Sequence, residues 1–257
     1  MRISLIGSGR VATHLAVKLA HQHEIIQIFS RDIEHAQQLA NQVQAQAIND
    51  YAQFSKQIDL LIIAVSDQNI QQVIQLIGNT LADVLIVHTS GSTNLNVLTN
   101  VHQRAGVFYP LQTFTLGREI DWELTPLFVE AHRTEDNQIL IALAESLSKK
   151  VYLYNSEQRL SLHLAAVFAC NFSNYCYDMA KQIVDQQQVD FSLLYPLILE
   201  TAHKATQHDP KTMQTGPAMR GDQNILAMHQ QMLVEAKNED LQKVYELLSQ
   251  QLLVRHQ

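Results

Sequence analysis

Short apolar runs alternate with amphipathic stretches through the first part of the chain. The first run covers residues 3–6 and leads into a helical pattern that ends near residue 21, and the second covers residues 24–29. Residues 59–65 and 84–88 are almost continuously apolar and too short for most helices. Such runs are typical of strands that are buried on both faces of a sheet. The alternation predicts parallel strand–helix–strand units wound right-handedly.

Weaker patterns complete this sheet. We expect amphipathic helices over residues 33–43, 70–77 and 135–147, and further strands near 47–48 and over 106–114, 126–130 and 150–154. The strand that begins at residue 106 is expected to run out into a loop that carries polar side chains. Asn155 lies where this alternating pattern ends.

From residue 156 onward the sequence has helical periodicity only. The helical stretches cover residues 157–184, 191–206, 222–237 and 239–254. The predicted fold class is therefore α/β, in two domains. Residues 1–155 form a Rossmann domain with a doubly wound, mostly parallel sheet, and residues 156–257 form an all-α domain.

The turn after the first strand has the spacing of a dinucleotide-binding site. Gly7 permits a tight turn, Gly9 lets the backbone approach a pyrophosphate closely, and Ala12 keeps the following helix near the sheet. The helix N-terminus then faces the phosphates with free N–H groups and a positive dipole end. We expect the cofactor to contact five consecutive residues here, Gly7, Ser8, Gly9, Arg10 and Val11.

The residues at the end of the second strand distinguish an NAD site from an NADP site. An NAD site usually has an acidic residue there, whereas a hydroxyl followed by arginine suits a 2′-phosphate. The sequence has Ser30 and Arg31, so we expect NADP. The alternative is that Arg31 is a surface residue and Asp32 only caps the next helix.

Other polar residues follow later strands of the sheet. Val65, Ser66, His88 and Ser90 come at strand ends and are expected to contact the cofactor. His88 can instead cap nearby backbone groups. Gln112 and Thr113 can donate hydrogen bonds to a polar substrate group, or only satisfy their own loop.

Composition narrows the class of protein. The 257 residues are 46% hydrophobic and 17% charged, as in a globular protein with a packed core. A formal net charge of -7 without a lysine or arginine run argues against nucleic-acid or anionic-membrane binding. No apolar run approaches the roughly 20 residues that span a bilayer, and the start of the chain lacks a signal-peptide layout. Cys170 and Cys176 share a predicted helix at a spacing that forbids a disulfide, so we expect a cytoplasmic protein.

The combined pattern resembles the 6-phosphogluconate dehydrogenase-like superfamily, in which a Rossmann domain precedes a helical domain that often dimerises. Within it, the chain looks most like bacterial Rossmann-like oxidoreductases of unassigned substrate with their own helical C-terminal domain. Pyrroline-5-carboxylate reductase and deazaflavin-linked NADP reductases are more distant. The resemblance implies NADP binding, reductase-like chemistry and a homodimer formed through the helical domain. It is carried by Gly7–Ala12, His88–Ser92, Tyr109–Phe114, His163 with Asn171, and Thr215–Asp222.

His163 and Asn171 are the catalytic candidates. At 3.6 residues per turn, they lie within about 80° of the same direction, roughly two turns apart, and can face one cleft. Some hydroxyacid dehydrogenases of the superfamily have a lysine and an asparagine four residues apart on this helix. Here Val167 stands four residues before Asn171, so the resemblance does not supply the proton donor. His163 can donate a proton to the substrate as hydride arrives from the nicotinamide. The alternative is a structural role, in which His163 forms a hydrogen bond within a helix interface.

Arg220 is the strong cation of a glycine-bounded loop. Its planar guanidinium suits a carboxylate or phosphate of the substrate. The structural alternative is an ion pair with Asp222 or with a dimer partner. His203, His208 and Asp209 lack the spacing of metal ligands, so no metal site is expected.

These features favour an NADP-dependent oxidoreductase that transfers a hydride between nicotinamide and a small carbonyl, hydroxy-acid or imine substrate. The alternatives are a non-catalytic NADP-binding sensor or scaffold, and a binder of acyl groups or phosphorylated metabolites that uses Arg220.

Overall fold

A computed structural model describes residues 1–77 and 80–256 of the chain. The chain divides into two compact units, Met1–Phe168 and Ala169–Gln257. The first unit contains an eight-stranded sheet with the order β3-β2-β1-β4-β5-β6-β7-β8. Its strands are β1 (Arg2–Ile6), β2 (Glu24–Phe29), β3 (Gln46–Ile48), β4 (Leu60–Ile63), β5 (Leu85–His88), β6 (Ala105–Pro110), β7 (Leu127–Ala131) and β8 (Val151–Leu153).

The sheet is mostly parallel, as predicted. Strands β1 to β6 run parallel to their neighbours in the order typical of a Rossmann domain. Strand β7 is antiparallel to β6, and β8 is parallel to β7. The carboxyl ends of β1, β2, β4, β5 and β6 therefore share one edge, where ligands bind in open α/β sheets.

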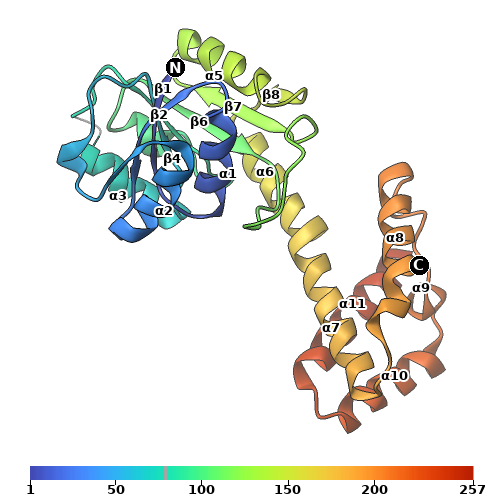
Figure 1. Cartoon of the computed structure of the whole chain (residues 1–257). Coiled ribbons are helices and arrows are strands. Elements are labelled where there is room, and N and C mark those ends of the chain that lie inside the picture. The colour runs from blue at the N-terminus through green and yellow to red at the C-terminus, as the bar shows by residue number, and fades with distance from the viewer. Residues whose placement is uncertain (78–79, 257) are drawn as a thin grey trace. The chain divides into compact units, whose positions relative to one another are not determined.

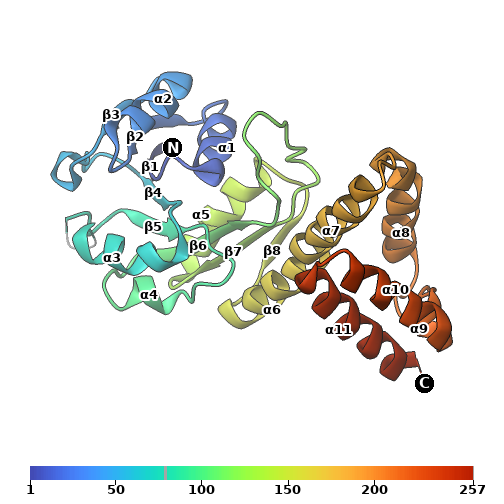
Figure 2. The ribbon, with the colours of Figure 1, turned by 90° about the horizontal axis from the view of Figure 1, so that it is seen from below.

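Helices cover both faces of this sheet (Figures 1 and 2). Side chains of α1, α2 and α5 belong to one apolar cluster with Leu5 and Ile62, and those of α3 and α4 belong to a second with Ile6 and Ile63. Because successive strand residues enter opposite clusters, a strand between two helical layers must be apolar throughout. These helices are α1 (Arg10–Leu19), α2 (Ile33–Val43), α3 (Asp67–Ile77), α4 (Asn96–Thr99) and α5 (Thr134–Glu145).

Helix α6 (Ser156–Ala166) belongs to the first unit. It begins with a capping box, in which the Asn155 side chain accepts from the Gln158 backbone and the Gln158 side chain accepts from the Asn155 backbone. This start agrees with the predicted change of pattern at Asn155. The boundary between the two compact units lies after Phe168, later in the chain than the predicted boundary at residue 155. Helix α6 therefore belongs to the unit that contains the sheet.

The second unit is helical, as predicted. Within the described residues, its apolar core is one cluster of three buried side chains, Met179, Leu233 and Leu241. Ala218 is buried as well. The turns at residues 191–194 and 217–220 were not resolved as separate helices by the sequence pattern. The elements are α7 (Ser173–Gln186), η3 (Phe191–Leu194), α8 (Tyr195–Gln207), α9 (Pro217–Arg220), α10 (Gln223–Glu235) and α11 (Glu239–His256).

A π-helix, η2 (Val167–Phe172), lies between α6 and α7. The sequence pattern predicted one regular helix from residue 157 to residue 184. A π-helix has i→i+5 hydrogen bonds and therefore a wider turn than an α-helix. The estimate of about 80° between His163 and Asn171 assumed regular α geometry and does not apply across this segment.

Candidate functional site

The two glycines of the first turn have different structural roles. Gly7 has a φ of +117°, and a Cβ there would lie 2.3 Å from the backbone oxygen of Ala64. Its N–H donates to the Phe29 oxygen at 2.8 Å, so the fold itself requires this glycine. A Cβ on Gly9 would meet nothing within 4 Å, and α1 begins at the next residue. The open approach to a helix N-terminus fits a pyrophosphate.

At the end of β2, Arg31 is exposed and Asp32 caps α2 by accepting from the Glu34 N–H at 2.9 Å. The structure therefore contains the helix cap at Asp32 that the sequence analysis considered as an alternative. Within residues 1–77 and 80–256, Arg31 forms no hydrogen bond or ion pair, so its guanidinium is available to an anion. Tyr51 stacks on Phe29 beside this turn, with ring centroids 4.2 Å apart. Burial raises the pKa of Tyr51, and the Arg31 charge acts in the opposite direction.

The end of β4 leads directly into α3, which begins at Asp67, before the predicted start at residue 70. Val65 packs against the second apolar cluster, and the Ser66 hydroxyl accepts from the Asn69 side chain at 2.7 Å. Asp67 is exposed, and its Oδ2 accepts from the Ser92 hydroxyl at 2.5 Å. This bond joins the first residue of α3 to the loop after β5.

His88 is fully buried at the end of β5. Its Nδ1 accepts from the Ser90 N–H at 3.1 Å, which leaves the ring proton on Nε2. Burial, with a smaller effect of the Arg159 charge, lowers the pKa of His88 to about 3. Nε2 is buried without a hydrogen-bond partner in the part of the chain that the structure describes. The His88 ring thus supports the backbone of this loop, and its contact with the cofactor stays a prediction.

Ser90 also folds the loop after β5. Its hydroxyl accepts from the N–H groups of Ser92 and Thr93, at 3.1 and 2.9 Å. Its contact with the cofactor stays a prediction, like those of the other residues proposed to bind it.

Arg159 on α6 fixes this loop from the other side, and the sequence analysis did not identify it. Its side chain is 1% exposed and forms an ion pair with Glu130 at 2.5 Å. The guanidinium donates to the Ser90 oxygen at 3.3 Å and to the Thr93 oxygen at 2.7 Å. Its position four residues before His163, on the same face of a helix, was the available signal.

His163 lies beside Tyr109, the fifth residue of β6. Its Nδ1 is 3.2 Å from the Tyr109 hydroxyl. A Cβ on Gly91 would lie 2.6 Å from Tyr109 Cζ and 2.8 Å from His163 Nδ1, so only glycine fits against the pair. Burial raises the pKa of Tyr109 to about 12, although the Arg159 charge opposes this. The structure thus brings His163 together with Tyr109 and the loop after β5, at the edge of the sheet that holds the glycine turn.

The remaining candidates lie apart from this cluster or outside its unit. The Gln112 side chain accepts from the Thr113 N–H at 2.8 Å, which satisfies part of their own loop. Asn171 lies in the π-helix and is exposed, in the second unit. Arg220 ends α9 and is exposed, while Asp222 caps α10 by accepting from the Ile225 N–H at 3.3 Å.

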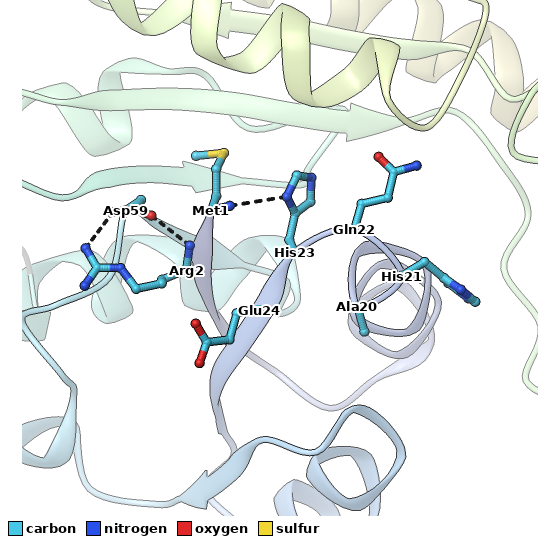
Figure 3. Close-up of a pocket in the computed structure, with 8 residues that line it drawn as sticks. All are labelled: Met1, Arg2, Ala20, His21, Gln22, His23, Glu24 and Asp59. Carbon is cyan, nitrogen blue, oxygen red and sulfur yellow. Dashed lines mark hydrogen bonds and ion pairs between the residues drawn. The ribbon is translucent and has the colours of Figure 1, made fainter.

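A hollow of about 510 Å³ lies at the opposite edge of the sheet, where β1 and β2 begin (Figure 3). In it the Arg2 side chain pairs with Asp59 at 2.9 Å, and the terminal amine lies 3.4 Å from His23 Nδ1. Because ligands bind at the carboxyl edge of such sheets, we do not assign this hollow to the cofactor. It is lined by Met1, Arg2, Ala20, His21, Gln22, His23, Glu24 and Asp59.

Within residues 1–77 and 80–256, no group of three or more His, Cys, Asp or Glu side chains is arranged to hold a metal ion. Over the same residues, no helix combines the length and apolar character needed to cross a bilayer.

Two family models match most of the chain. Residues 2–91 match the family described as NADP oxidoreductase, coenzyme F420-dependent, and residues 125–252 match a domain of unknown function, DUF2520. No curated protein matches the chain.

Solved structures show the same relationship. A Bacteroides fragilis protein described as a candidate NADP oxidoreductase is 42% identical, with a TM-score of 0.92 over 98% of this chain and 97% of that one. A Thermotoga maritima protein is 22% identical, with a TM-score of 0.71 over 99% and 98%. Plasmodium falciparum pyrroline carboxylate reductase, solved with NADP bound, is 12% identical, with a TM-score of 0.57 over 100% and 98%. The last two share the fold.

Proposed function

Because the chain belongs to the family of Rossmann-type NADP oxidoreductases that carry a DUF2520 domain, we propose that it reduces a small carbonyl or imine compound, or oxidises the corresponding hydroxy acid. This family and its cofactor, NADP, are those that the sequence analysis predicted. One observation carries the proposal: His163 Nδ1 lies 3.2 Å from the Tyr109 hydroxyl, in the same unit as the glycine turn.

The proposed cofactor site follows the carboxyl edge of the sheet. NADPH supplies the hydride when bound. The open space at Gly9 and the free N–H groups of α1 support binding of the pyrophosphate. The exposed Arg31 and the neighbouring Ser30 suit the 2′-phosphate. The nicotinamide end is assigned to the later strand ends, with Val65, Ser66, His88 and Ser90.

His163 is the proposed general acid. Its Nδ1 bonds to Tyr109, while Nε2 forms no hydrogen bond within the described residues. A protonated imidazole can donate a proton to oxygen or nitrogen as the adjacent carbon accepts hydride. Gln112 and Thr113 are proposed to bind the substrate, and Asn171 is proposed as the second catalytic residue. Arg220 is suited to a carboxylate or phosphate of the substrate.

We also propose a homodimer formed through the helical unit. Three buried hydrophobic side chains are a small core for residues 169–257, while Leu193, Leu197 and Leu199 are 71%, 62% and 61% exposed. Monomers rarely expose so many large apolar side chains in so short a segment, and a second copy would bury them. The exposed free thiols of Cys170 and Cys176 fit a cytoplasmic location.

Sedimentation velocity tests the dimer. The chain is expected to sediment as a dimer, and Leu197→Glu on α8 should shift it towards monomer. Leu76→Glu is the matched control, because Leu76 is also exposed, at 53%, but lies on α3 of the first unit. A wild-type chain that is monomeric at every concentration contradicts the proposal.

Thermal unfolding with NADPH, followed by turnover of a panel of small carbonyl and imine acids, tests the activity. NADPH at 100 times its Kd should add about 2.7 kcal/mol to the free energy of unfolding. His163→Asn should keep this stabilisation and lose turnover. Stabilisation without turnover of any panel member favours a sensor or scaffold, and no stabilisation by NADPH removes the proposed cofactor site.

A further inference from the structure

We infer that Tyr109 is a positioning residue for His163: its hydroxyl holds Nδ1, which leaves Nε2 as the nitrogen that delivers a proton to the substrate. This inference rests on the proposed role of His163 as the acid. Tyr109 was not among the site residues identified from the sequence, and nothing in the comparisons assigns it a role.

The geometry of the pair supports a specific contact. Tyr109 Oη and His163 Nδ1 are 3.2 Å apart, and the two rings meet edge to face with centroids 6.2 Å apart. Tyr109 is 9% exposed and packs on Phe128, so its ring has little freedom to turn away. A phenol hydroxyl both donates and accepts, and can therefore hold Nδ1 in either protonation state of the imidazole.

The hydrogen-bond roles follow from the proton count. Protonated His163 carries a hydrogen on each nitrogen, so Nδ1–H donates to Tyr109 Oη and Nε2–H is left for the substrate. When the substrate takes the Nε2 proton, His163 becomes neutral, and Nδ1–H keeps its bond to Oη. No proton leaves Tyr109 in this step.

Tyr109 itself is a poor acid at this position. Burial raises its pKa to about 12, so loss of its proton near neutral pH is strongly unfavourable. The neighbouring charges do not change this conclusion. Arg159 is neutralised by Glu130 on β7, and Asp67 on α3 raises the pKa of Tyr109 further. The hydroxyl therefore orients His163 and does not replace it.

The backbone at Gly91 makes the contact possible. A side chain there would occupy the space of Tyr109 Cζ, Tyr109 Oη and His163 Nδ1, at 2.6, 2.8 and 2.8 Å from Cβ. The loop that carries Gly91 is fixed by Arg159 through the oxygens of Ser90 and Thr93. Substitution of Gly91 is thus a second way to separate the pair while Tyr109 is retained.

Ring ¹⁵N NMR of the whole chain at one fixed pH tests the inference without a substrate. The His163 ring resonances are assigned by their loss in His163→Asn. In Tyr109→Phe, the Nδ1 resonance of His163 should shift, because the hydrogen bond to Nδ1 is lost. Gly91→Ala should shift the same resonance.

Tyr152→Phe is the matched control. Tyr152 also stacks on Phe128, with centroids 5.3 Å apart, but it is 41% exposed, and its hydroxyl forms no hydrogen bond in the described part of the chain. It should leave the His163 Nδ1 resonance unchanged. With a substrate from the panel, Tyr109→Phe should lower kcat about tenfold, as for one lost hydrogen bond, and leave the Kd of NADPH unchanged.

The outcomes separate the inference from the proposed function. A His163 Nδ1 resonance that is the same in wild type, Tyr109→Phe and Gly91→Ala overturns the inference, even if NADPH binds and His163→Asn abolishes turnover. If the resonance shifts as expected but His163→Asn retains full turnover, the contact is real and the catalytic role of the pair is overturned.

Discussion

The guanidinium of Arg159 forms a 2.5 Å ion pair with Glu130 while its side chain is only 1% exposed. The pair joins α6 to β7, and Arg159 also donates to two backbone oxygens of the loop after β5. Glu130 accepts a further bond from the Ser156 hydroxyl at 2.8 Å. One buried charge thus connects the helix that carries His163 to the loop that carries Gly91.

Arg159→Met should destabilise the chain by about 3 kcal/mol, because it leaves a partly buried carboxylate and two loop oxygens without their donor. Urea unfolding measures this. The control is Lys149→Met, which removes the exposed 2.5 Å pair with Glu123 and should have no measurable effect. An Arg159→Met chain as stable as wild type would show that the pair does not hold the loop.

Alanine at Gly7 should lower the stability of the chain, whereas alanine at Gly9 should weaken NADPH binding. Gly7→Ala adds a Cβ 2.3 Å from the Ala64 oxygen at a φ of +117°, so we expect a loss of about 3 kcal/mol or more of stability. Gly9→Ala meets nothing within 4 Å and should unfold like wild type, but bind NADPH at least about tenfold more weakly. Thermal unfolding and NADPH titration check both. Undiminished NADPH affinity in Gly9→Ala would remove the pyrophosphate from this turn.

His88 should make the chain less stable as the pH falls from about 6.5 to 3. Burial lowers its pKa to about 3 from the usual histidine value of 6.5. In this window the unfolded state binds a proton that the folded state does not, so stability falls by up to roughly 1.4 kcal/mol per pH unit. Above pH 6.5 the ring is neutral in both states and adds no pH dependence.

His88→Asn should flatten this dependence, because asparagine does not titrate and its oxygen can still accept from the Ser90 N–H. The measurement is the slope of unfolding free energy against pH between 7 and 4, compared with the exposed-site control His21→Asn. Equal slopes in wild type and His88→Asn would mean that His88 is charged in the folded chain.

Arg31→Ala should raise the Kd of NADPH about tenfold to a hundredfold and leave that of NADH nearly unchanged, because only NADPH has a 2′-phosphate for the guanidinium. Fluorescence titration of both nucleotides measures the ratio. Arg133→Ala is the control, since this exposed arginine follows β7, whose end pairs with the start of β6 at the opposite edge of the sheet. An unchanged ratio would assign the 2′-phosphate to other residues.

Much of the fold could be predicted because its signals are local. The helix over residues 33–43 and the strand over residues 24–29 have the bounds that their periodicity predicted. The helical pattern predicted to begin at residue 222 also agrees with the start of α10, which Asp222 caps. The π-helix was not, since i→i+5 hydrogen bonds leave no sequence period that distinguishes six residues within a longer helix.

The sequence by itself determined the strand–helix alternation, the glycine turn and the arginine that suits NADP, because each depends on residues close together in the chain. Only the tertiary structure decided which side chains meet at the proposed acid. Tyr109 and His163 are separated by 54 residues, and Arg159 contacts Ser90 across 69. These contacts depend on where α6 packs on the sheet and on the space left by Gly91. No local pattern records them, because they arise only when distant segments are brought together by burial of the core.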